Sequence, residues 1–196
     1  REVLKKEGAD YLLTSKLDDI AWIFNLRGSD VPDNPVFYAY SLIPAKGNAT
    51  LFINEEKVPA DLKEQLAEEG VVLAPYHSVG AALASLSSGT VLADPEEINA
   101  SLLSRLPEQI TQLELPNPIE LMKALKTPEE IELISEAMLK DGVALVRFFA
   151  WLDRNLGKEE MTEQSLADKL LYFRKSLPGY ISLSFETISA FGPNAA

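Results

Sequence analysis

The sequence contains no cysteine and a single histidine, His77. The absence of cysteine excludes disulfides, thiolate metal sites and a cysteine nucleophile within these residues, and it fits a reducing compartment. A histidine-based triad has only one candidate, and no Ser, Asp or Glu stands at catalytic spacing within a few residues of it. We therefore interpret His77 as a turn residue near a helix start rather than as a general base or ligand.

Common catalytic and phosphate-binding patterns are also missing. The chain has no G-x-G-x-x-G, Walker A, H-E-x-x-H or G-x-S-x-G pattern. No apolar run approaches the roughly 18 residues of a membrane span. The net charge of −12 would repel a nucleic-acid backbone or an anionic membrane. We expect neither nucleic acid nor membrane as a partner.

The residues that are present predict an α/β structure over roughly the first 115 positions. Hydrophobic residues make up 46% of the chain, enough to build a core, and short apolar runs alternate with amphipathic stretches. A short polar link at residues 44–48 predicts one antiparallel pair in a mixed sheet with helices on both faces. The expected strands are 11–14, 36–43, 49–53, 71–74, 90–93 and 111–115. The expected helices are 16–24, 55–69, 78–86 and 95–105.

Asp18 and Asp19 invite either a catalytic or a capping interpretation. Ser15 with Asp18 three residues later is a capping-box pattern, and both acids suit the positive end of a helix dipole. The capping interpretation accounts for position and residue type together, so we prefer it.

A second part of the chain begins after the prolines Pro116 and Pro118. Thr127 with Glu130 predicts a capped helix that runs to about Asn155, and Thr162 predicts the start of another. The alternating stretch 182–191 then predicts a strand that breaks at a Gly-Pro turn. The acids Glu129, Glu130, Glu132 and Glu136 are interpreted as solvated helix surface rather than a cation site. From the residues alone, we assign no catalytic residue and no metal ligand.

Three stretches are more specific than a general pattern: "LDDIAWIFNLRGSDVPDNPVFYAYSLI" (17–43), "DGVALVRFFAWLD" (141–153) and "ADKLLYFRKSLPGYISLSFETISAFGPNAA" (167–196). Together they resemble Xaa-Pro aminopeptidase (aminopeptidase P) of the cytosolic three-domain type, a pita-bread metallopeptidase. The resemblance is collinear over nearly the whole chain.

The resemblance implies that residues 1–120 form a creatinase amino-terminal-like α/β middle domain. Residues 127–196 would be the truncated start of the pita-bread α+β catalytic domain, with its opening helices and first strand. It also implies an enzyme that hydrolyses the bond before a proline at the second position of a peptide. The implied enzyme is cytoplasmic, homodimeric and uses two manganese ions per active site. The five metal ligands of the family have no counterpart in this segment, which we therefore expect to be inactive alone.

Three side chains remain open to more than one interpretation. Phe185 and Phe191 alternate along the predicted strand and are candidates for the wall of an apolar substrate pocket, although a core role is favoured for each. Arg27, in the family-like stretch at 25–30, either faces a neighbouring domain or, as we prefer, holds its own loop through Asp30 or Asp33. Two alternatives to the aminopeptidase are a prolidase or creatinase-like hydrolase and a metal-free pita-bread relative that binds peptides or proteins.

Overall fold

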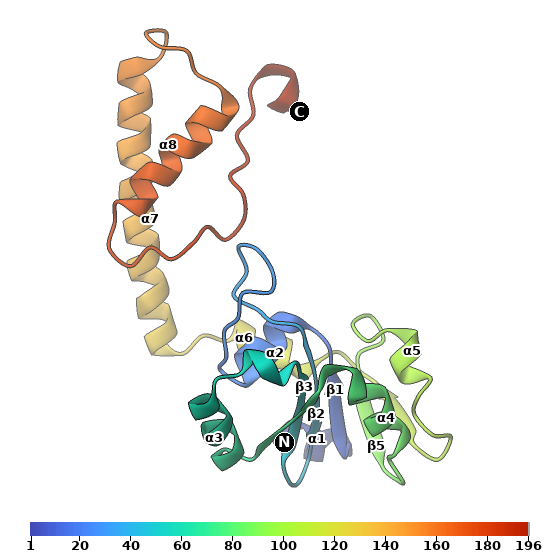
Figure 1. The fold of residues 1–196 in the computed structure, drawn as a ribbon. Helices are drawn as coiled ribbons and strands as arrows, with labels where there is room; N and C mark the ends of the chain where they lie inside the picture. Colours follow the sequence, from blue (N-terminus) through green and yellow to red (C-terminus); the bar gives the residue numbers. More distant parts are fainter. Residues whose placement is uncertain (196) are drawn as a thin grey trace. The chain divides into compact units, whose positions relative to one another are not determined.

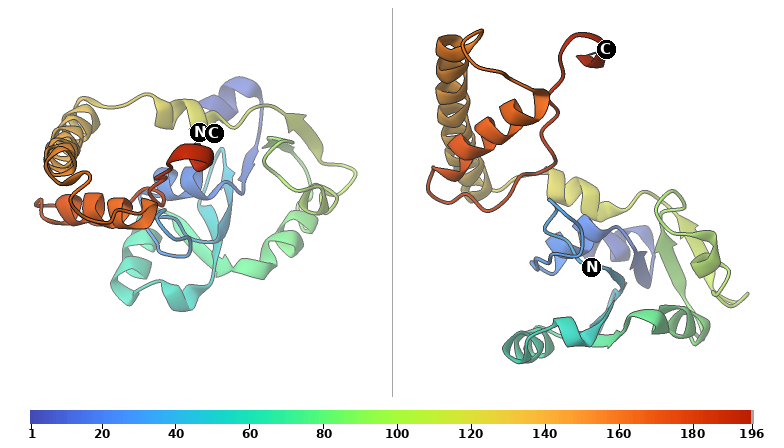
Figure 2. Two further views of the ribbon diagram at one scale, coloured as in Figure 1. Left: turned by 90° about the horizontal axis from the view of Figure 1, so that it is seen from above. Right: turned by 45° about the horizontal axis from the view of Figure 1, so that its top comes forward.

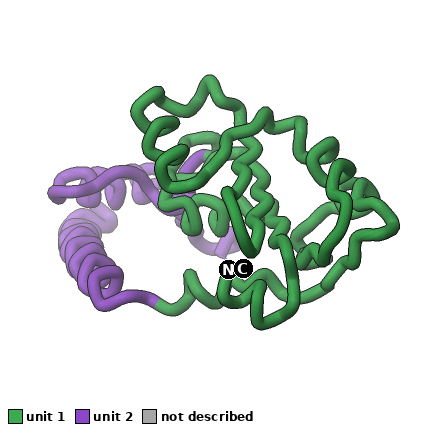
Figure 3. The backbone as a smooth tube through the Cα atoms, turned by 90° about the horizontal axis from the view of Figure 1, so that it is seen from below, with its two compact units in different colours: residues 1–31, 35–125 green, residues 32–34, 126–196 purple. Residues whose placement is uncertain are grey.

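The computed structural model describes residues 1–195, which fall into two units (Figure 3). Unit 1 contains residues 1–31 and 35–125. Unit 2 contains residues 32–34 and the chain from residue 126 onward.

Unit 1 is built on one six-stranded sheet with the order β4-β3-β2-β1-β5-β6 (Figure 1). Five strands run parallel to one another, and β2 is antiparallel to both of its neighbours. The expected mixed sheet is confirmed, and the short polar link predicted between two strands joins β2 to β3 as a hairpin. The strands are β1 (Tyr11–Thr14), β2 (Ala39–Pro44), β3 (Ala49–Ile53), β4 (Val71–Pro75), β5 (Thr90–Ala93) and β6 (Thr111–Glu114).

Helices cover both faces of this sheet, as predicted. Strand residues alternate between the faces because the side-chain period of a strand is two. Leu13 of β1, for example, packs with the helices on one face, whereas Leu12 packs on the other. The α-helices of unit 1 are α1 (Glu2–Glu7), α2 (Leu17–Ile23), α3 (Ala60–Glu68), α4 (Val79–Ala84), α5 (Ala100–Leu103) and α6 (Pro118–Ala124), and the 3-10 turns are η1 (Glu55–Lys57) and η2 (Tyr76–Ser78).

Two of these helices form the core on one face of the sheet, and four contribute to the core on the other. Leu83 of α4 and Leu102 of α5 meet Phe52 and Val91 of the sheet on the first face. On the second face, the cores include residues of α1, α2, α3 and α6. Neither α1 nor α6 was predicted, since each is short and has few apolar repeats. The predicted helix at 55–69 is divided into η1 and α3, with Pro59 as the N-cap of α3.

Unit 2 contains the two helices that the caps predicted. Helix α7 (Pro128–Asn155) starts with a capping box in which Thr127 accepts from the Glu130 amide, and it ends before Gly157. Helix α8 (Glu163–Lys175) starts with an equivalent box formed by Thr162 and Ser165. The two helices pack against each other (Figure 2).

The prediction of a strand at 182–191 is wrong. The segment has no regular secondary structure, and residues 192–195 form the 3-10 turn η3 (Gly192–Ala195). A strand needs a neighbour to take up its backbone N–H and C=O groups. Within the described part of the chain, no strand pairs with these residues, so the alternating pattern alone does not make the segment a strand.

Burial in the sheet cores predicts a clear difference between two identical substitutions. Leu83 of α4 is fully buried, and Leu121 of α6 is 68% exposed. Leu83→Ala should lower the free energy of unfolding of unit 1 by about 3–5 kcal/mol because it leaves a cavity in a packed core. Leu121→Ala is the control and should change it by less than about 0.5 kcal/mol. Urea denaturation followed by circular dichroism measures both, and equal effects would contradict the packing described.

Candidate functional site

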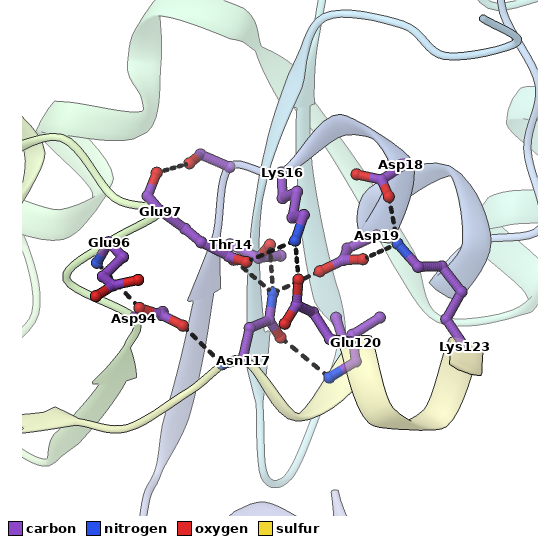
Figure 4. A network of polar contacts seen from close by, with 12 residues as sticks. Thr14, Lys16, Asp18, Asp19, Asp94, Glu96, Glu97, Asn117, Glu120 and Lys123 are labelled. Carbon is purple, nitrogen blue, oxygen red and sulfur yellow. Dashed lines mark hydrogen bonds and ion pairs between the residues drawn. The ribbon is translucent and has the colours of Figure 1, made fainter. Parts of the chain in front are cut away.

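The richest cluster of polar side chains in unit 1 lies at the carboxyl ends of three parallel strands. Thr14 ends β1, Asp94 follows β5, and Asn117 lies three residues after β6 (Figure 4). In open α/β sheets this edge is where ligands most often bind. We call the cluster of Thr14, Asp19, Glu97, Asn117 and their ion-pair partners the Asn117 network.

Asn117 is the centre of this network and is only 3% exposed. Its Nδ2 donates to Thr14 Oγ1 at 3.2 Å, to Asp19 Oδ2 at 2.9 Å and to Glu97 Oε2 at 3.0 Å. Its Oδ1 accepts from the Ile119 amide, and so caps α6. One side chain thus joins the first strand, the helix α2, the loop after β5 and the start of α6.

Two lysines form ion pairs with four carboxylates around Asn117. Lys16 Nζ donates to Glu97 Oε1 at 3.1 Å and also pairs with Glu120. Lys123 Nζ donates to Asp19 Oδ1 at 2.6 Å and also pairs with Asp18. Asp19 is fully buried, and its carboxylate is stabilised there by contacts with the ammonium of Lys123 and the side-chain amide of Asn117.

The capping box predicted for Ser15 and Asp18 is wrong. The N-cap of α2 is Lys16, with no capping bond from its side chain, and Ser15 instead donates to the Glu97 carbonyl at 2.8 Å. Helix α2 starts at Leu17, later than the pattern predicted, because residues 15 and 16 link it to the end of β1 without being helical. The two aspartates bind Lys123, a partner more than 100 residues away along the chain, which local spacing cannot reveal.

The pKa values of the Lys123 pair shift in opposite directions. Burial raises the pKa of Asp18, but the hydrogen bond and charge of Lys123 outweigh it, and the net pKa lies below the ordinary value of 3.8. Burial lowers the pKa of Lys123, but its bonds with Asp18 and Asp19 outweigh that effect, and the net pKa lies above 10.5. Both shifts favour the charged pair.

Three carboxylates of the network, Asp19, Glu97 and Glu120, have oxygens within 4.8 Å of one another. Such oxygen donors suit a hard cation. In this structure, however, Lys16 already lies between Glu97 and Glu120, and Asn117 and Lys123 take up both oxygens of Asp19. Each of the three carboxylates is thus already bonded inside the network, which we interpret as structural and which does not fit a metal centre.

A second site, which we call the tyrosine pocket, lies at the carboxyl ends of β3 and β4. It has a volume of about 710 Å³ and is lined by residues that include Tyr38, Tyr76 and His77. The Tyr76 ring lies 5.1 Å from that of Tyr40 and 5.2 Å from that of His77. Burial and the hydrogen bond with Tyr40 raise the pKa of Tyr76 to about 12. His77 lies in η2 just before α4, the turn position that was predicted.

The loop before β2 is held by Asp30. Its carboxylate accepts from the Tyr38 amide at 2.8 Å and from Lys57 Nζ at 2.6 Å. The hydrogen bond from Lys57, followed by that from the Tyr38 amide, lowers the pKa of Asp30. The interpretation that Arg27 holds this loop is wrong, since its guanidinium donates to the Leu26 carbonyl and Asp30 is bound by Lys57.

The same loop shows why a glycine stands in its "NLRGSD" stretch. A Cβ on Gly28 would lie 2.7 Å from the Phe37 Cβ, closer than side chains tolerate. The Gly28 amide donates to the Pro35 carbonyl across this narrow gap. The glycine therefore allows two backbone segments to approach each other.

The predicted pocket-wall residues lie in unit 2. Phe185 is 65% exposed and borders a cavity of about 760 Å³ whose walls also include Leu133 and Leu170. Phe191 is 83% exposed and does not border it. Neither side chain has the core position that the sequence favoured.

Sequence reasoning missed every member of the Asn117 network except the two aspartates. Asn117 stands between two prolines, in the sequence Pro-Asn-Pro, and that context was interpreted as a boundary. The usable signal was the asparagine itself, because an Asn followed by Pro is a typical N-cap with Pro at the first helical position.

Comparison with known proteins places this architecture in a family. Residues 1–130 match the model of the creatinase/prolidase N-terminal domain, and the chain belongs to that family. The whole chain is 38% identical to a protein named "Probable Xaa-Pro aminopeptidase P" from Ajellomyces capsulatus, of which it covers 34%. It is also 38% identical to "Xaa-Pro aminopeptidase ApepP" from Drosophila melanogaster, of which it covers 32%.

A solved structure is similar over almost the same range. The X-prolyl aminopeptidase from Caenorhabditis elegans, described as a cytosolic enzyme with a di-nuclear active site, superposes with a TM-score of 0.87 at 31% identity. The match covers 96% of this chain and 32% of that one. The chain thus spans about a third of the length of these relatives. In residues 1–195, none of the helices combines the length and hydropathy of a membrane span.

Exchanging the central amide for a carboxylate tests the Asn117 network. Asn117→Asp keeps the size but removes both N–H donors and adds a charge beside Asp19 and Glu97. It should lower the free energy of unfolding of unit 1 by about 2–4 kcal/mol at pH 7. Asn99→Asp is the matched control, because Asn99 caps α5 only by accepting from the Leu102 amide. An aspartate serves there equally well, and chemical denaturation should show little change.

Removing the ammonium of Lys123 should make stability depend on pH in a defined direction. Lys123→Met should cost about 2–4 kcal/mol at pH 7, since it leaves the Asp19 charge buried with one partner fewer. Because the folded pKa of Asp18 is depressed, that pair's contribution is present above pH 3.8 and is lost as the pH falls further. Because the folded pKa of Lys123 is raised, its contribution is full below pH 10.5 and is lost above it.

The difference in unfolding free energy between the original chain and Lys123→Met should therefore narrow at both pH extremes. Lys6→Met is the control, since Lys6 is 82% exposed and lies 3.7 Å from Glu7. A difference that stays constant from pH 3 to pH 11 would argue against charge as the origin of the effect.

Proposed function

We propose that the whole protein is a metal-dependent aminopeptidase that removes an amino-terminal residue preceding a proline. The main support for this proposal is the 38% identity along the entire chain to proteins named as Xaa-Pro aminopeptidases. The alignments cover the whole chain, and so both units, which favours this activity over that of a protein sharing only the fold. The structural similarity to the enzyme from C. elegans supports the same proposal.

The proposed substrate is a peptide with proline in second position. The bond before proline is a tertiary amide, and the pyrrolidine ring removes an N–H and fixes φ. A peptidase for this bond must therefore recognise the proline ring itself. Phe185 and Phe191 are our candidates for an apolar wall near that ring, and the exposure of both leaves them available to contact other chain segments or a ligand.

We further propose that residues 1–120 are the middle domain of the whole protein and that residues 127–196 begin its catalytic domain. The described residues supply a scaffold but no fitting metal centre. Two manganese ions, bound by ligands elsewhere in the whole protein, are the proposed cofactor, because oxygen-rich ligation suits manganese. A cytoplasmic homodimer is the proposed state of the whole protein.

Peptidase assays on the full-length protein and on the 196-residue chain test this proposal. The full-length protein should release alanine from Ala-Pro-Ala and much less from Ala-Ala-Ala. EDTA should abolish the release, and added manganese should restore it. The 196-residue chain should show no turnover, and calorimetry should find no tight manganese site on it.

Each component of the proposal can fail separately in these assays. Equal cleavage of both peptides would overturn the proline specificity. Restoration by zinc but not by manganese would overturn the choice of metal and leave the peptidase activity standing. A full-length protein that binds the peptides without cleaving them would favour the metal-free binding module.

A further inference from the structure

The tyrosine pocket has the size and composition of a ligand site. Its volume of about 710 Å³ lies within the range of small-ligand and peptide side-chain pockets. Its wall combines the rings of Tyr38, Tyr76 and His77 with the side chains of Glu55, Glu56 and Lys57. Tyr38 is half-exposed, so its ring is available to a ligand.

The charge available in this pocket is negative. Lys57 is the one lysine in its wall, and it is held by Asp30 at 2.6 Å. Glu55 and Glu56 form no ion pair with any residue in the range 1–195. The chain as a whole carries a net charge of −12, which raises the local concentration of cations. A positively charged ligand group is therefore favoured over a neutral or negative one.

The aromatic part of the wall already accepts a cation. The Nζ of Lys57 lies 6.0 Å from the centroid of the Tyr38 ring, within the range of a cation–π contact. A guanidinium is planar, weakly hydrated and able to stack on aromatic rings, and it also donates to carboxylates through several N–H groups. It thus satisfies both features of the wall, the rings and the two glutamates, better than an ammonium does.

We propose that the tyrosine pocket binds the arginine side chain of a peptide segment. The guanidinium stacks on the exposed tyrosine ring and donates to Glu55 or Glu56, while the peptide backbone stays at the mouth of the pocket. The proposal does not rest on the proposed function, because binding is measured directly and without turnover.

The single histidine of the chain provides a local probe of the pocket. The imidazole C–H protons of His77 give the only histidine signals in a proton NMR spectrum, since no other histidine is present. Titrating the 196-residue chain with acetyl-Gly-Gly-Arg-Gly-Gly-amide at constant pH should shift these signals in a saturable way. The matched peptide in which citrulline replaces arginine has nearly the same shape but no charge. It should bind at least about tenfold more weakly.

Two double variants separate the pocket from the overall charge. Glu55→Gln with Glu56→Gln should weaken binding of the arginine peptide by about fivefold or more. Glu64→Gln with Glu68→Gln changes the net charge equally but on the exposed surface of α3, and it should leave the affinity almost unchanged. Tyr38→Leu keeps an apolar side chain without the ring face and should also weaken binding. Circular dichroism confirms that each variant is folded.

Several results would overturn the proposal. Equal affinity for the arginine and citrulline peptides would show that charge is not recognised. Binding without any shift of the His77 signals would place the peptide elsewhere. Equal weakening by the two double variants would show that binding depends only on the net charge of the chain. Absence of binding at millimolar concentrations of the arginine peptide would exclude the site.

Discussion

The buried carboxylate of Asp19 is the constraint on which much of unit 1 depends. A fully buried charge is tolerated only when hydrogen bonds and an opposite charge replace the water it has lost. Those partners are Asn117 and Lys123, which come from the start and the end of α6. The short helix α6, with Leu121 largely exposed, is held both by these polar contacts and by the burial of Ile119 in the core. One carboxylate thus connects helix α2, near the start of the unit, to α6, its last helix.

The two units differ in how they are stabilised. In unit 1, three apolar clusters pack on both faces of a sheet, and its polar residues are paired where they are buried. In unit 2, the long helix α7 leaves large side chains such as Ile131, Met138 and Phe149 mostly exposed in the described chain. A bidentate ion pair between Arg174 and Asp141 fixes α8 on α7 where apolar contact is limited.

The sequence predicted those parts of the fold that depend on local periodicity. Strand positions, the β2–β3 hairpin and the capping boxes at Thr127 and Thr162 all follow from residues within a few positions of one another. What it could not predict depends on distant partners. Asp19 resembles a helix cap until Lys123 is placed beside it, and the alternation at 182–191 resembles a strand although none of the described strands pairs with it. The candidate sites were missed for the same reason, since each is assembled from three or more separated segments.

The reversed direction of β2 has a consequence for how this unit can vary. Because β2 alone is antiparallel to the rest of the sheet, the segment that leads into it lies at the same rim as the carboxyl ends of the other five strands. The Asn117 network and the tyrosine pocket both lie at this rim, whereas the opposite rim has short connections such as the turns at Gly47 and Gly70, both with positive φ. That opposite rim is where a tag, a loop extension or a relocated chain terminus would disturb the unit least. The loops on the first rim carry the polar side chains of the two clusters, whereas the short connections on the opposite rim are the better positions for additional residues.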